Sequence, residues 1–298
     1  MRDSYEPFEA LVAPARPTAA LPRLAMGIVF TIILFYSLIF CLSALLGLIF
    51  SGETLARYDA TLRTGDTPFG VLANLYVFGL AVIALSIALR QIHARDLLSI
   101  VGNIALAKTQ FGRVCLYLVG LHVFLLFLLP SHPDAVPAPH IKLSEWLILL
   151  PLALPAVLVQ TGTEELIFRG YLQSQLAARY TRGIVWIAIP SVLFGFLHYD
   201  TGAMGNNALL VMLWATAFGI AAADLTARSG TLGPAIALHF TNNVAAILLA
   251  SPEGNFDGLA LYTYPFSLDD ADAVWIWAPV DIMVLFLSWL AARIAIRR

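Results

Sequence analysis

Two adjacent carboxylates and an arginine interrupt an almost uncharged part of the sequence. Glu164 and Glu165 are followed by Arg169, and residues 147–159 and 184–197 on either side contain no charged residue. An ionised side chain at the centre of a bilayer costs at least about 2.5–3.5 kcal/mol. The three charges therefore need a solvated helix end, mutual pairing or a polar cavity, and a carboxylate in such a cavity can act as a general base.

Pairing is expected for one of the two glutamates. Glu165 and Arg169 are spaced i,i+4 with the acid on the N-terminal side, which is the better orientation for a helical ion pair. Glu164 lies one residue earlier and about 100° round the helix, so it faces elsewhere. A carboxylate without an internal cation in a low dielectric takes up protons more readily, which favours a general base working near neutral pH.

Two further polar pairs follow at the same helical spacing. Phe194 and His198 are i,i+4, and so are His239 and Asn243. Each pair therefore projects from one face of its helix. An imidazole and a carboxamide on one face supply two hydrogen-bond donors for a developing negative charge.

Composition defines the elements that must hold these side chains. The 298 residues are 60% hydrophobic and 12% charged, with a mean hydropathy of +0.82. Soluble domains carry about 25% charged residues, so a polytopic helical membrane protein is expected. A net charge of −2 provides no basic surface for nucleic acid. Cys41 and Cys115 fall in apolar runs and indicate neither a disulfide framework nor a thiolate metal site.

We predict an all-α fold of about eight transmembrane helices with a polar catalytic layer. A span of about 20 residues crosses about 30 Å of hydrocarbon. The predicted spans are residues 24–50, 69–89, 113–129, 143–180, 183–198, 207–226, 231–250 and 273–296. Residues 1–22 are predicted to be a polar, loosely ordered cytoplasmic arm, and residues 23–298 a single membrane domain.

Polar side chains fall at overlapping depths on three of these spans. They are Glu164, His198, His239 and Asn243. With a rise of 1.5 Å per residue, they lie roughly 14 to 24 Å from the cytoplasmic ends of their helices. This estimate requires the fourth span to stay helical through Pro151, Pro155 and Gly162. If the helix breaks there, Glu164 moves to a helix N-terminus with Thr163 as its cap.

The distribution of basic residues predicts the orientation. With the N-terminus inside, all of the 17 Lys and Arg residues except Arg57, Arg63 and Lys142 fall in or beside cytoplasmic segments. The positive-inside rule therefore places both termini in the cytoplasm, and we expect a multi-pass protein of the bacterial inner membrane.

Other polar residues have simpler interpretations. His122, within the third span, is expected to be hydrogen-bonded or interfacial, and His93, in a connection, is expected to be solvated. Asp224 and Arg228 form an i,i+4 pair at a helix end and are expected to be structural. Asp281 is a stray acid in the last span with no evident companion.

The motifs together resemble a known family. Glu164-Glu165-x-x-x-Arg169, Phe194-x-x-x-His198 and His239-x-x-x-Asn243 are similar to the three motifs of the CPBP intramembrane proteases. That group contains the type II CAAX prenyl endopeptidases and the bacterial Abi proteins. The resemblance covers a protease-like core of about residues 145–250, and the first 140 or so residues show none.

The resemblance implies a membrane endopeptidase acting on membrane-associated peptides or proteins, including prenylated CAAX substrates. Glu164 and His198 would activate water, and His239 and Asn243 would stabilise the oxyanion. Glu165, Arg169 and Phe194 would support them. A zinc ion held by Glu164, His198 and His239 is the alternative. We expect no cofactor, because the sequence contains no HExxH and because Asn suits an oxyanion hole better than a zinc shell.

Two other classes of function remain open. One is a non-catalytic membrane scaffold or immunity protein, although a scaffold needs no Glu/His/His/Asn set. The other is a proton-coupled transporter, for which intramembrane Glu and His are equally natural. Against a transporter, the sequence shows no inverted repeat and no paired broken helices.

Overall fold

The computed structural model describes residues 3–128, 136–254 and 256–297. Within these residues the chain is almost entirely helical, which confirms the predicted all-α polytopic fold. Residue 129, the expected end of the third span, lies outside the described part. Six helical segments are long and apolar enough to cross a membrane: α2 (Leu21–Ile49), α4 (Pro68–His93), α5 (Ile104–Leu128), α6–η5–α7 (Leu143–Arg179), α9–η6–α10 (Thr201–Ser229) and α12 (Ala271–Ile296).

Two shorter apolar helices are also present in the described residues. They are α8 (Gly183–Phe196) and α11 with its π-helical extension η7 (Gly233–Leu249). Together with the six long segments they correspond to the eight spans predicted from the sequence. The long helix α6 (Leu143–Glu165) stays helical through Pro151 and Pro155. It then widens into the π-helix η5 (Leu166–Gln173) before α7 (Ser174–Arg179). The sequence pattern did not predict this widening.

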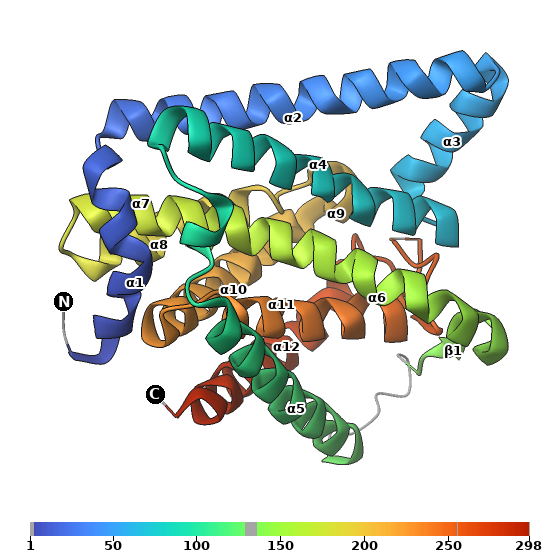
Figure 1. Cartoon of the computed structure of the whole chain (residues 1–298). Helices are drawn as coiled ribbons and strands as arrows, with labels where there is room; N and C mark the ends of the chain where they lie inside the picture. The colour runs from blue at the N-terminus through green and yellow to red at the C-terminus, as the bar shows by residue number, and fades with distance from the viewer. Residues whose placement is uncertain (1–2, 129–135, 255, 298) are drawn as a thin grey trace.

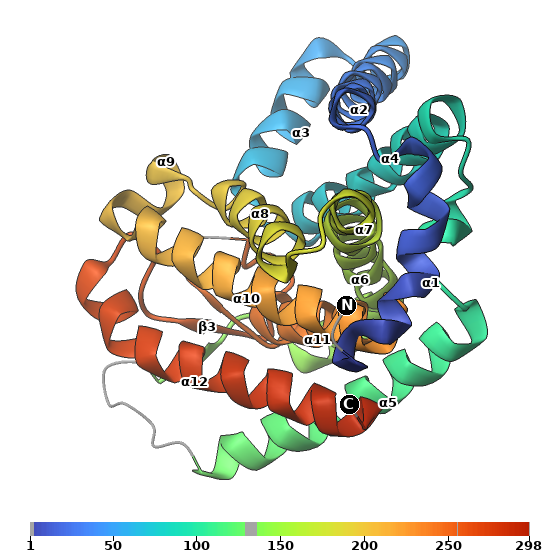
Figure 2. The ribbon, with the colours of Figure 1, turned by 90° about the vertical axis from the view of Figure 1, so that its left-hand side faces the viewer.

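The helices form a bundle with the motif-bearing segments at its centre. Figure 1 shows α6 and α11 running side by side through the middle, with α2 and α4 above them and α5 below. The turned view in Figure 2 shows α5 and α12 closing the side opposite to α2 and α4. Helix α11 contacts α5, α6, α10 and α12, and α10 also contacts α8. Two core clusters hold the bundle together, one of them between α4 and α6.

The outward faces of the bundle are apolar. Helix α2 packs mainly against α4, and none of its most hydrophobic 18-residue window is buried. Side chains such as Phe40, Leu48 and Ile49 are largely exposed along it. A water-soluble monomer rarely exposes so large an apolar surface, whereas lipid tails cover it at no cost. The protein is an integral multi-pass membrane protein.

Short elements connect and cover the spans. They are η1 (Asp3–Phe8), α1 (Glu9–Val12), η2 (Ala13–Thr18), α3 (Gly52–Thr64), α9 (Thr201–Met204), η3 (Leu97–Ile100) and η6 (Gly205–Asn207). A small sheet has the order β1-β3-β2, from β1 (Ala138–Pro139), β2 (Ala250–Pro252) and β3 (Tyr262–Tyr264). Strand β3 pairs antiparallel with β1 and parallel with β2.

The N-terminal arm is packed, and the prediction that it is loosely ordered is wrong. Phe8, Leu11 and Val12 are at most 1% exposed and belong to the larger core cluster. The Phe8 ring lies 5.3 Å from that of Trp186 on α8. Gly230, with φ +70°, ends α10 directly under the arm, where a Cβ atom would come within 2.4 Å of the Pro7 carbonyl oxygen. The arm therefore closes one end of the bundle.

His93 is buried, contrary to the solvated position expected for it. Its side chain is 2% exposed at the end of α4, beneath the arm. The Nε2 atom lies 2.7 Å from the Tyr171 hydroxyl, and Nδ1 lies 2.9 Å from Gln175 Nε2 and 3.1 Å from Thr18 Oγ1. These partners come from three other segments, so the imidazole joins the arm to α4 and to the η5–α7 region.

Candidate active site

The two glutamates stand at the junction between α6 and the π-helix η5. The chain is helical on both sides of Glu164, so this residue is not at a helix N-terminus. Thr163 is not a cap, since its hydroxyl donates to the carbonyl oxygens of Val159 and Phe78 at 2.6 and 3.3 Å. Single π turns within α-helices occur frequently at functional sites.

Glu165 is paired with Arg169, as the spacing predicts. Arg169 Nη1 donates to Glu165 Oε1 at 3.1 Å, and both side chains are fully buried. His239 makes a second contact with the same oxygen, at 2.8 Å from Nδ1. Local spacing does not predict this contact, because it joins residues 74 positions apart.

His239 lies between the two glutamates. A carboxylate only accepts hydrogen bonds, so Nδ1–H donates to Glu165, and this bond assigns the proton to Nδ1. The opposite nitrogen, Nε2, then faces Glu164 Oε2 at 3.5 Å. The imidazole is further held by the edge-on ring of Phe218, whose centroid is 4.9 Å away. Helix α11 thus brings its histidine to the carboxylates of α6, which confirms that these two spans share a polar layer.

Phe194 lies at the centre of the charged group. The guanidinium of Arg169 sits 4.6 Å from the centroid of the Phe194 ring, a cation–π distance. The same ring lies 5.8 Å from His239 and 4.6 Å from His198. Gly219 on α10 allows a close approach to α8 and to the arginine, since a Cβ atom there would be 2.9 Å from Ser191 Cα and 3.2 Å from Arg169 Nη2. The phenyl ring therefore fixes the arginine and separates the two histidines.

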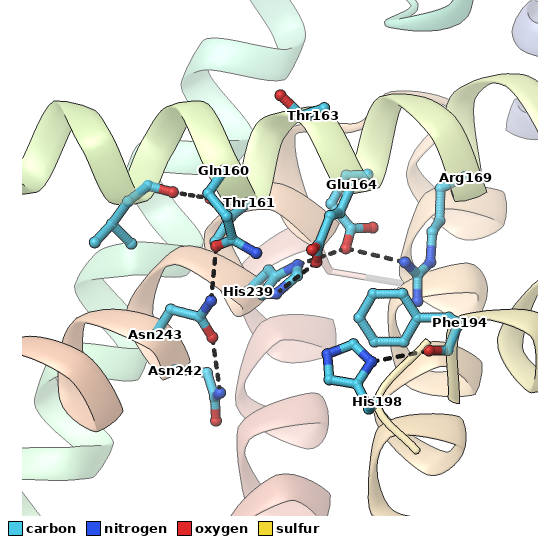
Figure 3. A network of polar contacts seen from close by, with 12 residues as sticks. Gln160, Thr161, Thr163, Glu164, Arg169, Phe194, His198, His239, Asn242 and Asn243 are labelled. Atoms are coloured by element: carbon cyan, nitrogen blue, oxygen red, sulfur yellow. Dashed lines mark hydrogen bonds and ion pairs between the residues drawn. The ribbon is translucent and has the colours of Figure 1, made fainter. Parts of the chain in front are cut away.

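His198 reaches the site without touching Glu164. Its Nδ1 atom lies 2.9 Å from the Phe194 carbonyl oxygen, just beyond the end of α8. Among the described residues no hydrogen bond or ion pair joins His198 to Glu164. The histidine is partly exposed, and within the described part of the chain its hydrogen bond is made through Nδ1 and not through Nε2. Figure 3 shows His198 below the Phe194 ring, with Glu164 and His239 above it.

Asn243 lies further along the same cluster. Its amide nitrogen donates to Gln160 Oε1 at 2.9 Å, and its oxygen accepts from Asn242 Nδ2 at 3.2 Å (Figure 3). Gln160 was not anticipated as a site residue. The signal was present, because Gln160 lies one helical turn before Glu164 in a run that is otherwise apolar.

The proposed zinc ligands do not converge. In the described part of the chain no group of three His, Cys, Asp or Glu side chains is placed to hold a metal ion. His239 Nε2 lies 3.5 Å from Glu164 Oε2, but His198 lies across the Phe194 ring from both. The donor set does not fit a tetrahedral zinc site in this arrangement.

Two polar residues outside the cluster behave as expected. His122 is hydrogen-bonded within its own helix, with Nδ1 2.7 Å from the Leu118 carbonyl oxygen. Asp224 accepts from Arg228 Nε at 2.9 Å. These contacts agree with a structural role for both.

Comparison with known proteins supports the resemblance seen in the motifs. Residues 145–245 match the family described as type II CAAX prenyl endopeptidase Rce1-like. The matched segment contains Glu164, His198, His239 and Asn243. This part of the chain is similar to the Rce1-like family in sequence.

A curated relative extends the similarity over about half of the chain. The uncharacterized protein YyaK of Bacillus subtilis (strain 168) is 28% identical over 152 residues, which are 51% of this chain and 50% of YyaK. The alignment therefore spans about half the length of that relative. No solved structure gives a significant match.

Proposed function

We propose that the protein is an intramembrane endopeptidase in which Glu164 is the general base. The supporting observation is the different use of the two adjacent glutamates. Glu165 accepts through Oε1 from both Arg169 and His239, whereas no hydrogen bond to Glu164 is formed among the described residues. The Glu164 side chain is 14% exposed although its Oε2 atom is buried, and we propose that water reaches the carboxylate through the exposed part.

In the proposed reaction, Glu164 takes a proton from water as the water oxygen attacks the scissile carbonyl carbon. The same carboxyl group then donates that proton to the leaving amine nitrogen. The Nε2 atom of His198 would help to orient the water. No step requires a redox partner, since hydrolysis only adds water across the peptide bond.

His239 and Asn243 would stabilise the negative charge on the carbonyl oxygen. His239 Nε2 faces Glu164 at 3.5 Å, and it can donate a hydrogen bond to the oxyanion when the imidazole carries a proton on both nitrogens. Asn243 has a second amide hydrogen besides the one bonded to Gln160. Donors preorganised in a water-poor site act strongly on developing charge.

The substrate class follows from the family and the location of the site. We propose membrane-associated peptides or proteins, with prenylated CAAX sequences as the first class to test. The cleavage is proposed to be metal-independent, in a bacterial inner membrane protein with both termini in the cytoplasm. The scaffold and transporter alternatives share the buried charges, but a scaffold needs no Glu/His/His/Asn set, and the sequence shows no inverted repeat of the kind found in many transporters.

Glu164→Gln tests this proposal. The variant keeps the shape of the side chain but cannot accept the proton, so cleavage of a fluorogenic prenylated CAAX peptide and of a membrane peptide library should be abolished. Its thermal unfolding in detergent should match that of the wild type. Full activity in Glu164→Gln would falsify the assignment of the base. Wild-type protein that moves protons across vesicles but cleaves no peptide would favour the transporter.

A further inference from the structure

Asn243 is held between two amide side chains that determine which end of its carboxamide faces each neighbour. Gln160 Oε1 accepts from Asn243 Nδ2 at 2.9 Å, and Asn242 Nδ2 donates to Asn243 Oδ1 at 3.2 Å. Gln160 comes from α6, one turn before Glu164, and Asn242 precedes Asn243 on α11. Figure 3 shows the three side chains in a row near Glu164 and His239.

This row matters because the two ends of a carboxamide have opposite effects on an oxyanion. The NH2 group donates to it, whereas the carbonyl oxygen repels it. If the Asn243 amide turned over alone, its oxygen would meet Gln160 Oε1 and its nitrogen would meet Asn242 Nδ2. Both contacts would pair like with like, so Gln160 and Asn242 favour the same orientation.

Gln160 is well placed to enforce that orientation. Its side chain is only 8% exposed, so water competes little for the hydrogen bond with Asn243. The bond also ties α11 to α6 near Glu164, which couples the position of the oxyanion donor to that of the base. One hydrogen of Asn243 Nδ2 is used by Gln160, and the other remains for the substrate oxygen.

We propose that Gln160 is a positioning residue that orients the Asn243 amide toward the substrate carbonyl oxygen. The proposal rests on the endopeptidase function above and adds a residue outside the three motifs. It implies that Gln160 acts on the rate of the chemical step through Asn243, with little effect on substrate binding.

Gln160→Met is the direct test, because methionine keeps the length of the side chain but offers no comparable acceptor. With a fluorogenic prenylated CAAX peptide, we expect kcat to fall by about tenfold to a hundredfold and KM to stay within about twofold. The matched control is Thr161→Val. Thr161 is also buried on the same turn, and among the described residues its hydroxyl donates to the Val157 carbonyl oxygen of its own helix alone. This control should keep the wild-type kcat.

A double-mutant cycle with Asn243→Ala separates positioning from general damage. If Gln160 acts through Asn243, then Gln160→Met should lower kcat no further in the Asn243→Ala background. The wild type, the two single variants and the double variant should also show non-additive shifts of Tm in detergent. This measurement needs no substrate.

The outcomes distinguish this proposal from the proposed function. Gln160→Met with wild-type kcat, or an equal loss in both backgrounds, overturns the positioning role and leaves the peptidase assignment intact. Additive Tm shifts contradict the contact itself. Wild-type protein without peptidase activity overturns the function and the positioning role together, while the Tm cycle still reports whether the two side chains interact.

Discussion

Two buried acid–arginine pairs in this protein share their spacing and differ in how fully their polar atoms are bonded. Asp224 and Arg228 lie at the end of α10, and Glu165 and Arg169 lie where α6 passes into η5. Both pairs are i,i+4 with the acid first, at 2.9 and 3.1 Å. From local sequence they are equivalent.

The Asp224 cluster is saturated. Both carboxylate oxygens accept from Arg228 Nε at 2.9 Å, and they also accept from the Tyr5 hydroxyl at 2.7 Å and from Trp289 Nε1 at 3.0 Å. Burial and the hydrogen bond to Asp224 raise the pKa of Tyr5, so its hydroxyl keeps its proton at neutral pH. Each of the two Asp224 carboxylate oxygens therefore accepts two hydrogen bonds, as is expected of a structural network.

The Glu165 cluster is not saturated. Among the described residues, Arg169 Nε and Nη2, Glu165 Oε2 and Glu164 Oε2 have no hydrogen-bond partner although they are buried. Such atoms are expensive to bury and need an explanation. Both clusters contain buried charges. What distinguishes the candidate site from the Asp224 cluster is that some of its buried charged atoms have no hydrogen-bond partner among the described residues.

Removing the arginine should produce the largest loss of stability. Arg169→Ala leaves Glu165 without its cation in a buried site, and we expect unfolding in detergent to become easier by about 3–5 kcal/mol. Changing both partners, with Glu165→Gln and Arg169→Gln, should recover much of the loss. Arg63→Ala is the matched control, because Arg63 and Asp59 are also i,i+4 at 3.1 Å but highly exposed. That control should cost less than about 1 kcal/mol. No recovery in the double variant would argue against the pairing.

Removing the oxyanion donor should mainly affect rate. Asn243→Ala should lower kcat by about 10²–10³ with little change in KM. Wild-type activity should survive prolonged incubation with EDTA or phenanthroline, because the proposed reaction uses no metal. A stoichiometric zinc ion, lost in His198→Ala together with activity, would instead establish the metalloprotease mechanism.

Changing the acid of the saturated cluster should have a smaller and purely structural effect. Asp224→Asn puts an amide NH2 group against the donors of Arg228 and Trp289, which should destabilise the protein by about 1–3 kcal/mol. The kcat of the folded fraction should be unchanged. A large loss of kcat at unchanged stability would remove the contrast between the two clusters.

The smallest effect is expected for Tyr5→Phe. The variant loses one hydrogen bond to Asp224 but keeps the ring, which lies 5.1 Å from the Arg228 guanidinium and packs edge-on against Trp186. We expect a loss of about 0.5–1.5 kcal/mol in detergent unfolding. A loss as large as that for Arg169→Ala would mean that the Tyr5 hydroxyl contributes more to stability than one hydrogen bond.

The sequence predicted the spans and the meeting of Glu165 with Arg169 because both depend on local periodicity. It did not predict the contact of His239 with Glu165 or the position of Gln160. A depth estimate is one-dimensional, and contacts between spans also depend on the rotation and tilt of each helix. For the same reason, the expectation that Glu164 pairs with His198 has no contact to support it in the structure.

The packed arm was missed although its signal was readable. Phe8, Leu11, Val12 and Ala15 follow the spacing of an apolar helical face. Four prolines within the first 22 residues suggested a loose segment instead. Proline is compatible with short 3-10 turns, and the arm is built largely from these.

The contact between Tyr5 and Asp224 also constrains the order in which the protein can be assembled. The two residues are 219 positions apart, and Trp186, against which Phe8 packs, comes almost as late. Since ribosomes make a chain from its N-terminal side, the arm must wait until five of the six long spans of the described residues have been synthesised. The arm therefore leaves the ribosome before the helices that it contacts and is among the last of these segments to reach its native place.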